Sequence, residues 1–270
     1  MKAHLLKIAG ASLAVLAIAA CSKTEPAPAE TPTPVVETPA ALVAPDYALF
    51  LTAADRPVAD AGDDAARKPA EVLAFAKVMP GQTVIDIEAG GGYYTELLSK
   101  AVGPNGKVIM QNPNFGPEFQ KDMDARVKDN RLPNVTQSQS NFDALSPADG
   151  TVDVATWFLG PHELYYKPKE NPAGFGDATK AYAEIFRVLK PGGTVVILDH
   201  AAAAGAPNTT GNDLHRIDPM LVKAAATTAG FVLEEESTIL ANPQDDHKKG
   251  VFDASIRRHT DQFLLRYKKP

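Results

Sequence analysis

Two groups of residues in this chain have the types and spacing to do chemistry, and the first is a glycine-rich run. Asp86, Glu88, Gly90 and Gly92 lie within the stretch V-I-D-I-E-A-G-G-G-Y-Y-T-E-L-L at 84–98. The apolar, β-branched start predicts a short buried strand, and the glycines allow a sharp turn and close approach of a ligand. The residues from 95 to 101 can continue as a helix, so a bound ligand would meet free backbone N–H groups at a helix start.

The second group consists of histidines that follow later strands. His162 lies just after the apolar stretch 152–159, and His200 ends the apolar stretch that begins at 194. Because the ends of parallel strands carry the ligand site in an open sheet, both histidines are candidate catalytic residues. His162 could act as a general base that takes a proton from an attacking acceptor, or it could simply cap its loop.

A metal site is a further hypothesis for the same region. It would use His162, Asp199, His200, His215 and Asp218, several of which could converge at the strand ends. Nitrogen and oxygen ligands of this kind suit a divalent metal, although their spacing matches no standard site.

The glycine-rich run resembles the first motif of class I S-adenosylmethionine (SAM)-dependent methyltransferases, with Asp86, Gly90 and Gly92 on the pattern. Glu88 stands where the first glycine of the usual trio would be. A carboxylate there would repel the carboxylate of SAM, but it could instead face the SAM ammonium. The resemblance implies that SAM is the cofactor and that Asp86, Glu88, Gly90 and Gly92 bind it.

The resemblance also implies contacts to the nucleoside part of SAM. Related enzymes place an acidic residue after the second strand to bind the ribose hydroxyls, and this chain has Gln111 followed by Asn112. A charged acceptor contributes about 1.5–3 kcal/mol and a neutral one about 0.5–1.5 kcal/mol, so Gln111 predicts weaker ribose binding. Asp143 is the candidate contact to the adenine amino group, although D-A-L-S-P could equally be a turn.

A second resemblance lies later in the chain. The run R-V-L-K-P-G-G at 187–193, followed by an apolar strand, is similar to a helix-ending turn of many class I methyltransferases. The stretches H-R-I-D at 215–218 and T-D-Q-F at 260–263 resemble those of a group of predicted bacterial methyltransferases. The resemblance covers residues 68–270 and implies an α/β, Rossmann-like class I methyltransferase fold. That fold is a mostly parallel, doubly wound sheet with a C-terminal antiparallel strand pair.

The remaining patterns predict the elements that position these residues. Apolar periodicity predicts helices at 69–78, 118–127, 178–189 and 219–229, and strands at 107–110, 135–138, 152–159, 194–198, 231–240 and 260–267. The charged stretch 55–68 is expected to form a solvated or salt-bridged lid. Pro191 and the two glycines after it are expected to form a turn.

The sequence pattern at the N-terminus predicts that the protein is exported. A positive start and the apolar stretch Ile8–Ala20, too short for a bilayer core of about 30 Å, are typical of a signal peptide over residues 1–20. Small residues before Cys21 resemble the lipobox of bacterial lipoproteins, which implies lipidation of Cys21 and an outer-membrane protein facing the periplasm. Residues 21–45 are then a Pro-rich, extended tether and residues 46–270 the methyltransferase-like domain.

Charge and composition limit the function. The net charge is −6 with no Lys/Arg cluster, which argues against nucleic acid as the main partner and leaves the lipid anchor as the membrane contact. The leading hypothesis is a SAM-dependent methyltransferase acting on a small molecule or an envelope component. The alternative is a non-catalytic ligand-binding module on a methyltransferase scaffold, favoured by Glu88, Gln111 and the export signal.

Overall fold

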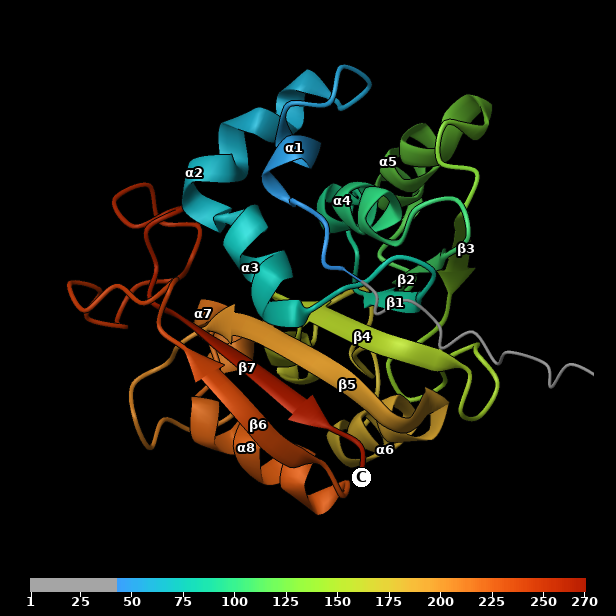
Figure 1. Cartoon of the computed structure of the whole chain (residues 1–270). Helices are drawn as coiled ribbons and strands as arrows, with labels where there is room; N and C mark the ends of the chain where they lie inside the picture. Colours follow the sequence, from blue (N-terminus) through green and yellow to red (C-terminus); the bar gives the residue numbers. More distant parts are fainter. Residues whose placement is uncertain (1–42) are drawn as a thin grey trace, which may run out of the picture. The chain divides into compact units, whose positions relative to one another are not determined.

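The computed structural model describes residues 43–270, whose sheet contains the strand β1 (Thr83–Ile87). Val84, Ile85 and Ile87 of β1 are buried, as their β-branched side chains favour. The sheet has seven strands in the order β3-β2-β1-β4-β5-β7-β6 (Figure 1). The other strands are β2 (Lys107–Asn112), β3 (Val135–Gln139), β4 (Val152–Phe158), β5 (Leu189–His200), β6 (Val232–Ser237) and β7 (Gln262–Lys268).

Strand directions follow the predicted fold class. β1 pairs in parallel with β2 and β4, and the parallel pairing extends to β3 on one side and β5 on the other. β7 runs antiparallel between β5 and β6. The prediction of a mostly parallel doubly wound sheet with a C-terminal antiparallel pair is therefore confirmed. Strand order reverses between β1 and β4, which leaves a crevice at their carboxyl ends.

Helices cover both faces of the sheet (Figure 1). One hydrophobic cluster joins α3 (Pro69–Ala76) and α4 (Tyr93–Val102) to one face, and a second joins α6 (Ala178–Val188) and α8 (Pro219–Thr228) to the other. All of the predicted helices form. The remaining helices are α1 (Ala48–Leu51), η1 (Val58–Asp63), α2 (Asp64–Arg67), α5 (Pro117–Val127), η2 (Lys128–Asn130), η3 (Pro161–Tyr165) and α7 (Thr210–Leu214).

The segment predicted as a turn at 190–193 is instead a bulge within the long strand β5. Leu189 pairs with Val152 and Thr194 pairs with Val154, so four residues of β5 lie opposite the single residue Asp153 of β4. Gly192 has a φ of 79°, and its N–H donates to the Lys269 carbonyl at 2.9 Å. The C-terminal end of the chain therefore holds the bulge as an extension of the sheet.

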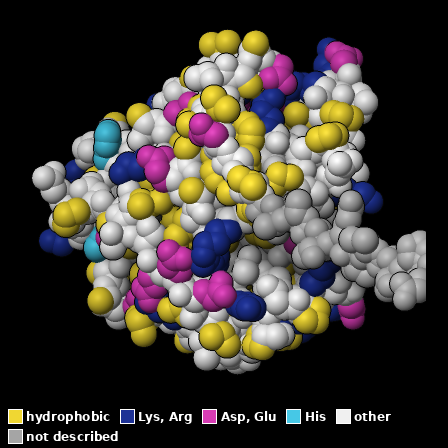
Figure 2. Space-filling view, in the orientation of Figure 1, with side chains coloured by type: hydrophobic (Ala, Val, Ile, Leu, Met, Phe, Trp, Pro, Cys, Tyr) yellow, Lys and Arg dark blue, Asp and Glu magenta, His cyan; other side chains and the backbone are white. Residues whose placement is uncertain are grey.

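The predictions for the signal peptide, for Cys21 and for most of the tether fall on residues 1–42, outside the described part of the chain. Among residues 43–270, no helix combines the length and the apolar character needed to cross a bilayer. On the face drawn in Figure 2, basic side chains lie interspersed with acidic ones.

Candidate functional site

The turn after β1 has left-handed backbone at three positions. Glu88, Gly90 and Gly92 have φ angles of 56°, 55° and 81°. Glycine adopts this conformation freely, whereas a residue with a Cβ loses roughly 1–2 kcal/mol there. Gly92 begins α4, and a Cβ at this position would lie 2.8 Å from Cγ of Arg126. Glycine at 92 is thus required both by conformation and by space.

The side chain of Glu88 points back toward β4 and η3. Its carboxylate accepts a hydrogen bond from Nε1 of Trp157 at 3.3 Å. A Cβ at Gly160 would overlap with both groups, so Gly160 provides the space that the Glu88 carboxylate occupies. Burial, followed by the charge of Glu163, raises the pKa of Glu88 well above its ordinary value.

The side-chain amides of the two residues at the end of β2 bond the backbone of this turn. Gln111 is fully buried, and its Oε1 accepts a hydrogen bond from the Glu88 N–H at 3.1 Å. Asn112 accepts from the Gly90 N–H at 2.8 Å and donates to the Gly90 carbonyl at 3.1 Å. Neither side chain lines the cavity described next. The sequence pattern placed Gln111 as a ribose ligand, whereas its amide is already used inside the protein.

A cavity of about 1150 Å³ opens over the turn at the carboxyl ends of β1 and β4. Its size is slightly above the range of about 300–1000 Å³ typical of ligand pockets. Of the four turn residues that the resemblance implies for the cofactor, Asp86, Glu88 and Gly90 line the cavity, whereas Gly92 does not. Aromatic rings form much of the wall, from Tyr93, Tyr94, Phe115, Phe119, Phe158 and Phe175.

Asp86 lines this cavity, and its side chain is buried. The carboxyl accepts hydrogen bonds from Thr95 Oγ1 at 2.7 Å and from Thr156 Oγ1 at 2.8 Å. Burial raises the pKa of Asp86 to about 6, against the opposing effect of these two bonds. Asp143, the predicted adenine contact, lies elsewhere: it accepts from the Asp177 N–H at 3.0 Å and does not line the cavity.

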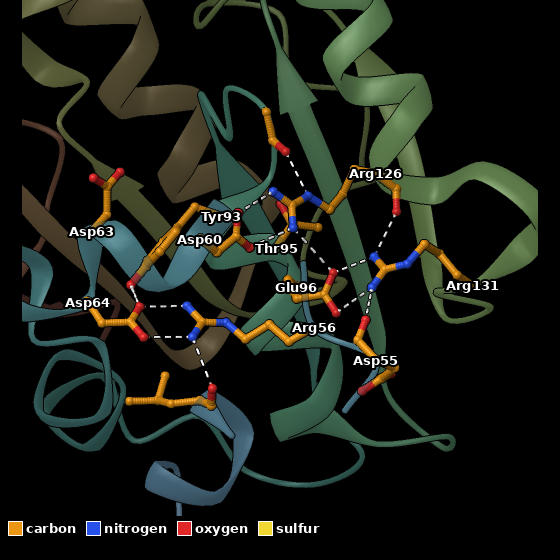
Figure 3. Close-up of polar contacts among 12 residues, drawn as sticks. Asp55, Arg56, Asp60, Asp63, Asp64, Tyr93, Thr95, Glu96, Arg126 and Arg131 are labelled. Carbon is orange, nitrogen blue, oxygen red and sulfur yellow. Dashed lines mark hydrogen bonds and ion pairs between the residues drawn. The ribbon is translucent and has the colours of Figure 1, made fainter. Parts of the chain in front are cut away.

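A network of ion pairs covers the start of α4 beside the cavity (Figure 3). Arg126 of α5 donates through Nε to the Gly91 carbonyl at 2.8 Å and pairs with Asp60 of η1 at 2.8 Å. Arg126 and Arg131 both reach Glu96, a carboxylate with no exposed surface. The glycine-rich turn is therefore tied to α5 and to the N-terminal segment.

The charged stretch 55–68 is salt-bridged, as predicted. Arg56 donates two hydrogen bonds to Asp64, at 2.6 and 2.7 Å, and Asp64 also accepts from the Tyr93 hydroxyl at 2.6 Å. Figure 3 shows Asp64 between the two donors. Asp60, Asp63 and Arg67 of the same stretch line the cavity, so this segment forms one of its walls.

A cluster of imidazole and carboxylate groups lies on another wall of the cavity. His162 Nδ1 donates to Asp199 Oδ1 at 2.8 Å, and its Nε2 lies 3.2 Å from Glu163 Oε1. His215 Nδ1 lies 3.3 Å from both His162 Nε2 and Glu163 Oε1. Glu163 and His215 face the cavity, whereas His162 lies behind them and does not line it.

The charges in this cluster depend on one another. Burial opposes a charge on His162, but Asp199 and Glu163 outweigh it and raise the His162 pKa to about 10. Burial likewise opposes the charge on Glu163, yet hydrogen bonds from His162 and His215 lower its pKa to about 2. When no ligand is bound, the cluster therefore contains an imidazolium–carboxylate pair at neutral pH.

Two other residues singled out from the sequence, His200 and Asp218, make their side-chain hydrogen bonds outside this cluster. His200 bonds Thr260 at 2.7 Å and lines a smaller cavity of about 170 Å³, and burial lowers its pKa to about 3. Asp218 caps α8 by accepting from the Met220 N–H at 2.9 Å. Glu163 was missed by sequence reasoning, although its position directly after His162 was a usable signal.

The sequence profile of the ubiE/COQ5 methyltransferase family matches residues 66–211, more than half of the chain. A ubiquinone/menaquinone biosynthesis C-methyltransferase of Hydrogenovibrio crunogenus is 26% identical over 194 residues, covering 72% of this chain and 66% of the relative. The enzyme of the same description from Salmonella paratyphi B is 30% identical, covering 70% of this chain and 64% of the relative. The chain thus spans just under two thirds of the length of these relatives.

Solved structures show the same fold. A SAM-dependent methyltransferase from Aquifex aeolicus matches with a TM-score of 0.57 and 21% identity, covering 83% of this chain and 99% of that one. The match to the family profile includes the glycine-rich turn, Glu163 and the strands that position them. The chain therefore belongs to the ubiE/COQ5 methyltransferase family.

Proposed function

We propose that this protein transfers a methyl group from SAM to a small organic acceptor. The observation that carries the proposal is the large cavity over the glycine-rich turn, at the point where strand order reverses. This is where open α/β sheets bind nucleotide-type ligands. Membership of a methyltransferase family supports the same conclusion.

The residues that line the cavity fit SAM. The cofactor carries an ammonium group, a carboxylate and an adenine ring, and it would supply an electrophilic methyl group. Glu88 would meet the ammonium, Arg67 the carboxylate, and the rings of Phe115 and Phe119 would stack on adenine. Methyl transfer depends mainly on proximity and alignment, so the chain needs no catalytic triad.

A more specific proposal concerns the chemical class of the methyl acceptor. The curated relatives are described as C-methyltransferases of ubiquinone and menaquinone biosynthesis, so an oxygen-substituted aromatic ring is the acceptor class that they suggest. The aromatic wall of the cavity suits such a ring. Glu163 and His215 would contact the acceptor, because they are the members of the histidine cluster that face the cavity.

We also propose that the protein is exported as a lipoprotein anchored through Cys21 and held at the outer membrane. The support is the sequence of residues 1–21, with its positive start, apolar stretch and small residues before the cysteine. An exported methyltransferase would need SAM on that side of the inner membrane.

Two observations favour a second function, a ligand-binding module that does not transfer methyl groups. Glu88 replaces a glycine at the turn, and Gln111 uses its amide inside the protein instead of offering a carboxylate to a ribose. The second feature weakens the expected binding of the ribose of SAM. The first weakens binding in the case where the Glu88 carboxylate meets the carboxylate of SAM and not its ammonium group. Binding of SAM by the purified chain separates the two functions.

The test is a calorimetric titration of SAM and S-adenosylhomocysteine into the chain and two glycine variants. Gly90→Ala adds a side chain at left-handed backbone that lines the cavity. Gly81→Ala is the matched control, because Gly81 is also left-handed, with open space at its Cβ position, and lies outside the cavity. Binding that Gly90→Ala weakens at least tenfold and Gly81→Ala leaves unchanged supports the proposal. Absence of heat at millimolar ligand, with folded protein, contradicts it.

A further inference from the structure

Three donor atoms in the histidine cluster lie at nearly equal distances from one another. His162 Nε2 and Glu163 Oε1 are 3.2 Å apart, and His215 Nδ1 is 3.3 Å from each of them. Hydrogen bonds from both nitrogens to Glu163 account for two sides of this triangle. They do not account for the third side, because two ring nitrogens that each carry a proton toward Glu163 cannot also bond each other. Three equal separations are instead typical of ligands around a common centre.

The size of the triangle matches the spacing of ligands in a tetrahedral metal site. Zn²⁺ binds imidazole nitrogen and carboxylate oxygen at about 2.0–2.1 Å in tetrahedral geometry, which places neighbouring ligands about 3.3 Å apart. Right-angled ligands at the same metal distance, as in the facial sites of non-haem iron, would be about 2.9 Å apart. The observed separations of 3.2 and 3.3 Å fit the tetrahedral arrangement.

The surroundings of His162 orient it as a metal ligand. Asp199 is fully buried and can only accept at Oδ1, so the hydrogen bond of 2.8 Å places a proton on His162 Nδ1. Asp199 Oδ2 also accepts from the His162 backbone N–H at 2.8 Å. This carboxylate–histidine pair directs Nε2 toward the other two donors, as second-layer carboxylates do in zinc sites. A metal ion would displace the Nε2 proton that His162 otherwise shares with Glu163.

His215 is positioned from a different part of the chain. It follows α7 in left-handed backbone with a φ of 53°, and the rings of Tyr166 and Phe252 pack against its imidazole with centroids 4.8 and 5.0 Å away. Gly211 lets α7 approach η3, because a Cβ there would lie 2.5 Å from the His162 carbonyl oxygen. The structure therefore brings together two histidines that are 53 residues apart.

We infer that His162 Nε2, Glu163 Oε1 and His215 Nδ1 bind a divalent transition-metal ion, Zn²⁺ by preference, in a tetrahedral site with its fourth position open to the cavity. Three protein ligands with an open position are the pattern of zinc sites that bind a substrate. The open position suits an oxygen donor such as a phenolate or enolate. The role for such an acceptor rests on the proposed methyl transfer, whereas the metal site itself does not.

The test is metal binding by the chain after removal of metals with a chelator. Titration with Co²⁺ as a spectroscopic probe, followed by displacement with Zn²⁺, should show one equivalent bound and the intense visible absorption of tetrahedral cobalt. His215→Ala and Glu163→Gln should each weaken Zn²⁺ binding at least 100-fold. Asp199→Asn, which acts through His162, should weaken it about 10–100-fold. His247→Ala is the matched control, because it removes a histidine paired with Asp261 outside the cluster and should leave affinity unchanged.

Circular dichroism checks the folding of each variant. If His215→Ala fails to fold, Glu163→Gln still tests the site, because it keeps the shape of the side chain. An octahedral type of cobalt spectrum, absence of stoichiometric binding, or binding that the cluster variants do not affect would overturn the inference. Titration of SAM into the same metal-free protein separates the two proposals. A chain that binds SAM but no metal overturns only the metal site, and a chain that binds metal but not SAM overturns only the methyl transfer.

Discussion

Gly160 and Glu88 occupy adjoining space, although they come from different strand ends. A Cβ at position 160 would overlap with Oε2 of Glu88 and with the indole of Trp157. The backbone of Gly160 has a φ of −124°, which any residue adopts, so the absence of a side chain is required by space alone. The glutamate at the glycine-rich turn and the glycine before η3 are thus complementary.

Gly160→Ala should therefore destabilise the fold by about 1–3 kcal/mol, as overpacking of a buried site does. In a Glu88→Gly background the same substitution should cost less, by about 0.5 kcal/mol or more, because one of the two overlaps is gone. Urea denaturation of the four proteins of this double-mutant cycle measures the difference. Strictly additive effects would show that the two positions do not compete for space.

Glu88→Gln should weaken SAM binding about tenfold, because a charged hydrogen-bond partner for the ammonium is replaced by a neutral one of the same shape. Glu170→Gln is the control, since Glu170 also lines the cavity but is exposed to solvent. Calorimetric titration of both variants gives the comparison. Tighter binding by Glu88→Gln would mean that Glu88 repels the cofactor, which favours the ligand-binding module.

Asp86→Asn should change how stability depends on pH. The folded-state pKa of Asp86 is raised to about 6, so between pH 4 and pH 6 the folded protein holds a proton that the unfolded chain has released. This group therefore lowers stability as pH rises through that window. The variant has no carboxyl group to titrate at this position. Its free energy of unfolding, relative to that of the wild type, should therefore increase by on the order of 2–3 kcal/mol between pH 4 and pH 7. Urea denaturation at the two pH values measures this, and a constant difference would contradict it.

Glu96→Gln should destabilise the fold by about 3 kcal/mol, because Arg126 and Arg131 lose the charge of a fully buried partner. Glu118→Gln is the matched control. Glu118 pairs with Lys121 on the surface, where both side chains are mostly exposed. Loss of this ion pair should lower the free energy of unfolding by less than about 1 kcal/mol. Similar losses in the two variants would show that the network in Figure 3 contributes little.

Cys21→Ser should abolish lipid attachment when the gene is expressed in a bacterium that processes lipoproteins. Cys21 is the only cysteine of the chain, so the substitution removes the only thiol. Labelled fatty acid should enter the wild-type protein, which should fractionate with the outer membrane, and the variant should do neither. A wild-type protein without label would contradict the predicted lipoprotein.

Local sequence patterns are enough to predict the fold and the position of the site. The β-branched strand, the left-handed glycines and the helix after them are local features, so Asp86, Glu88 and Gly90 could be assigned to one turn before any contact was known. Alternation and helical periodicity likewise predicted the other main strands and helices. The exception is the bulge at 190–193, whose backbone exchanges two hydrogen bonds with Lys269, the residue after β7.

The contacts of the side chains at the strand ends depend on tertiary packing. Gln111 and Asp143 are predicted as ligands from their position along the chain, yet each bonds a backbone group of the protein. His162, Glu163 and His215 converge because α7 packs against η3. Sequence spacing cannot report such contacts, since they depend on the angles at which distant helices pack. That packing, and not the local pattern, assembled the proposed metal site at the wall of the cavity.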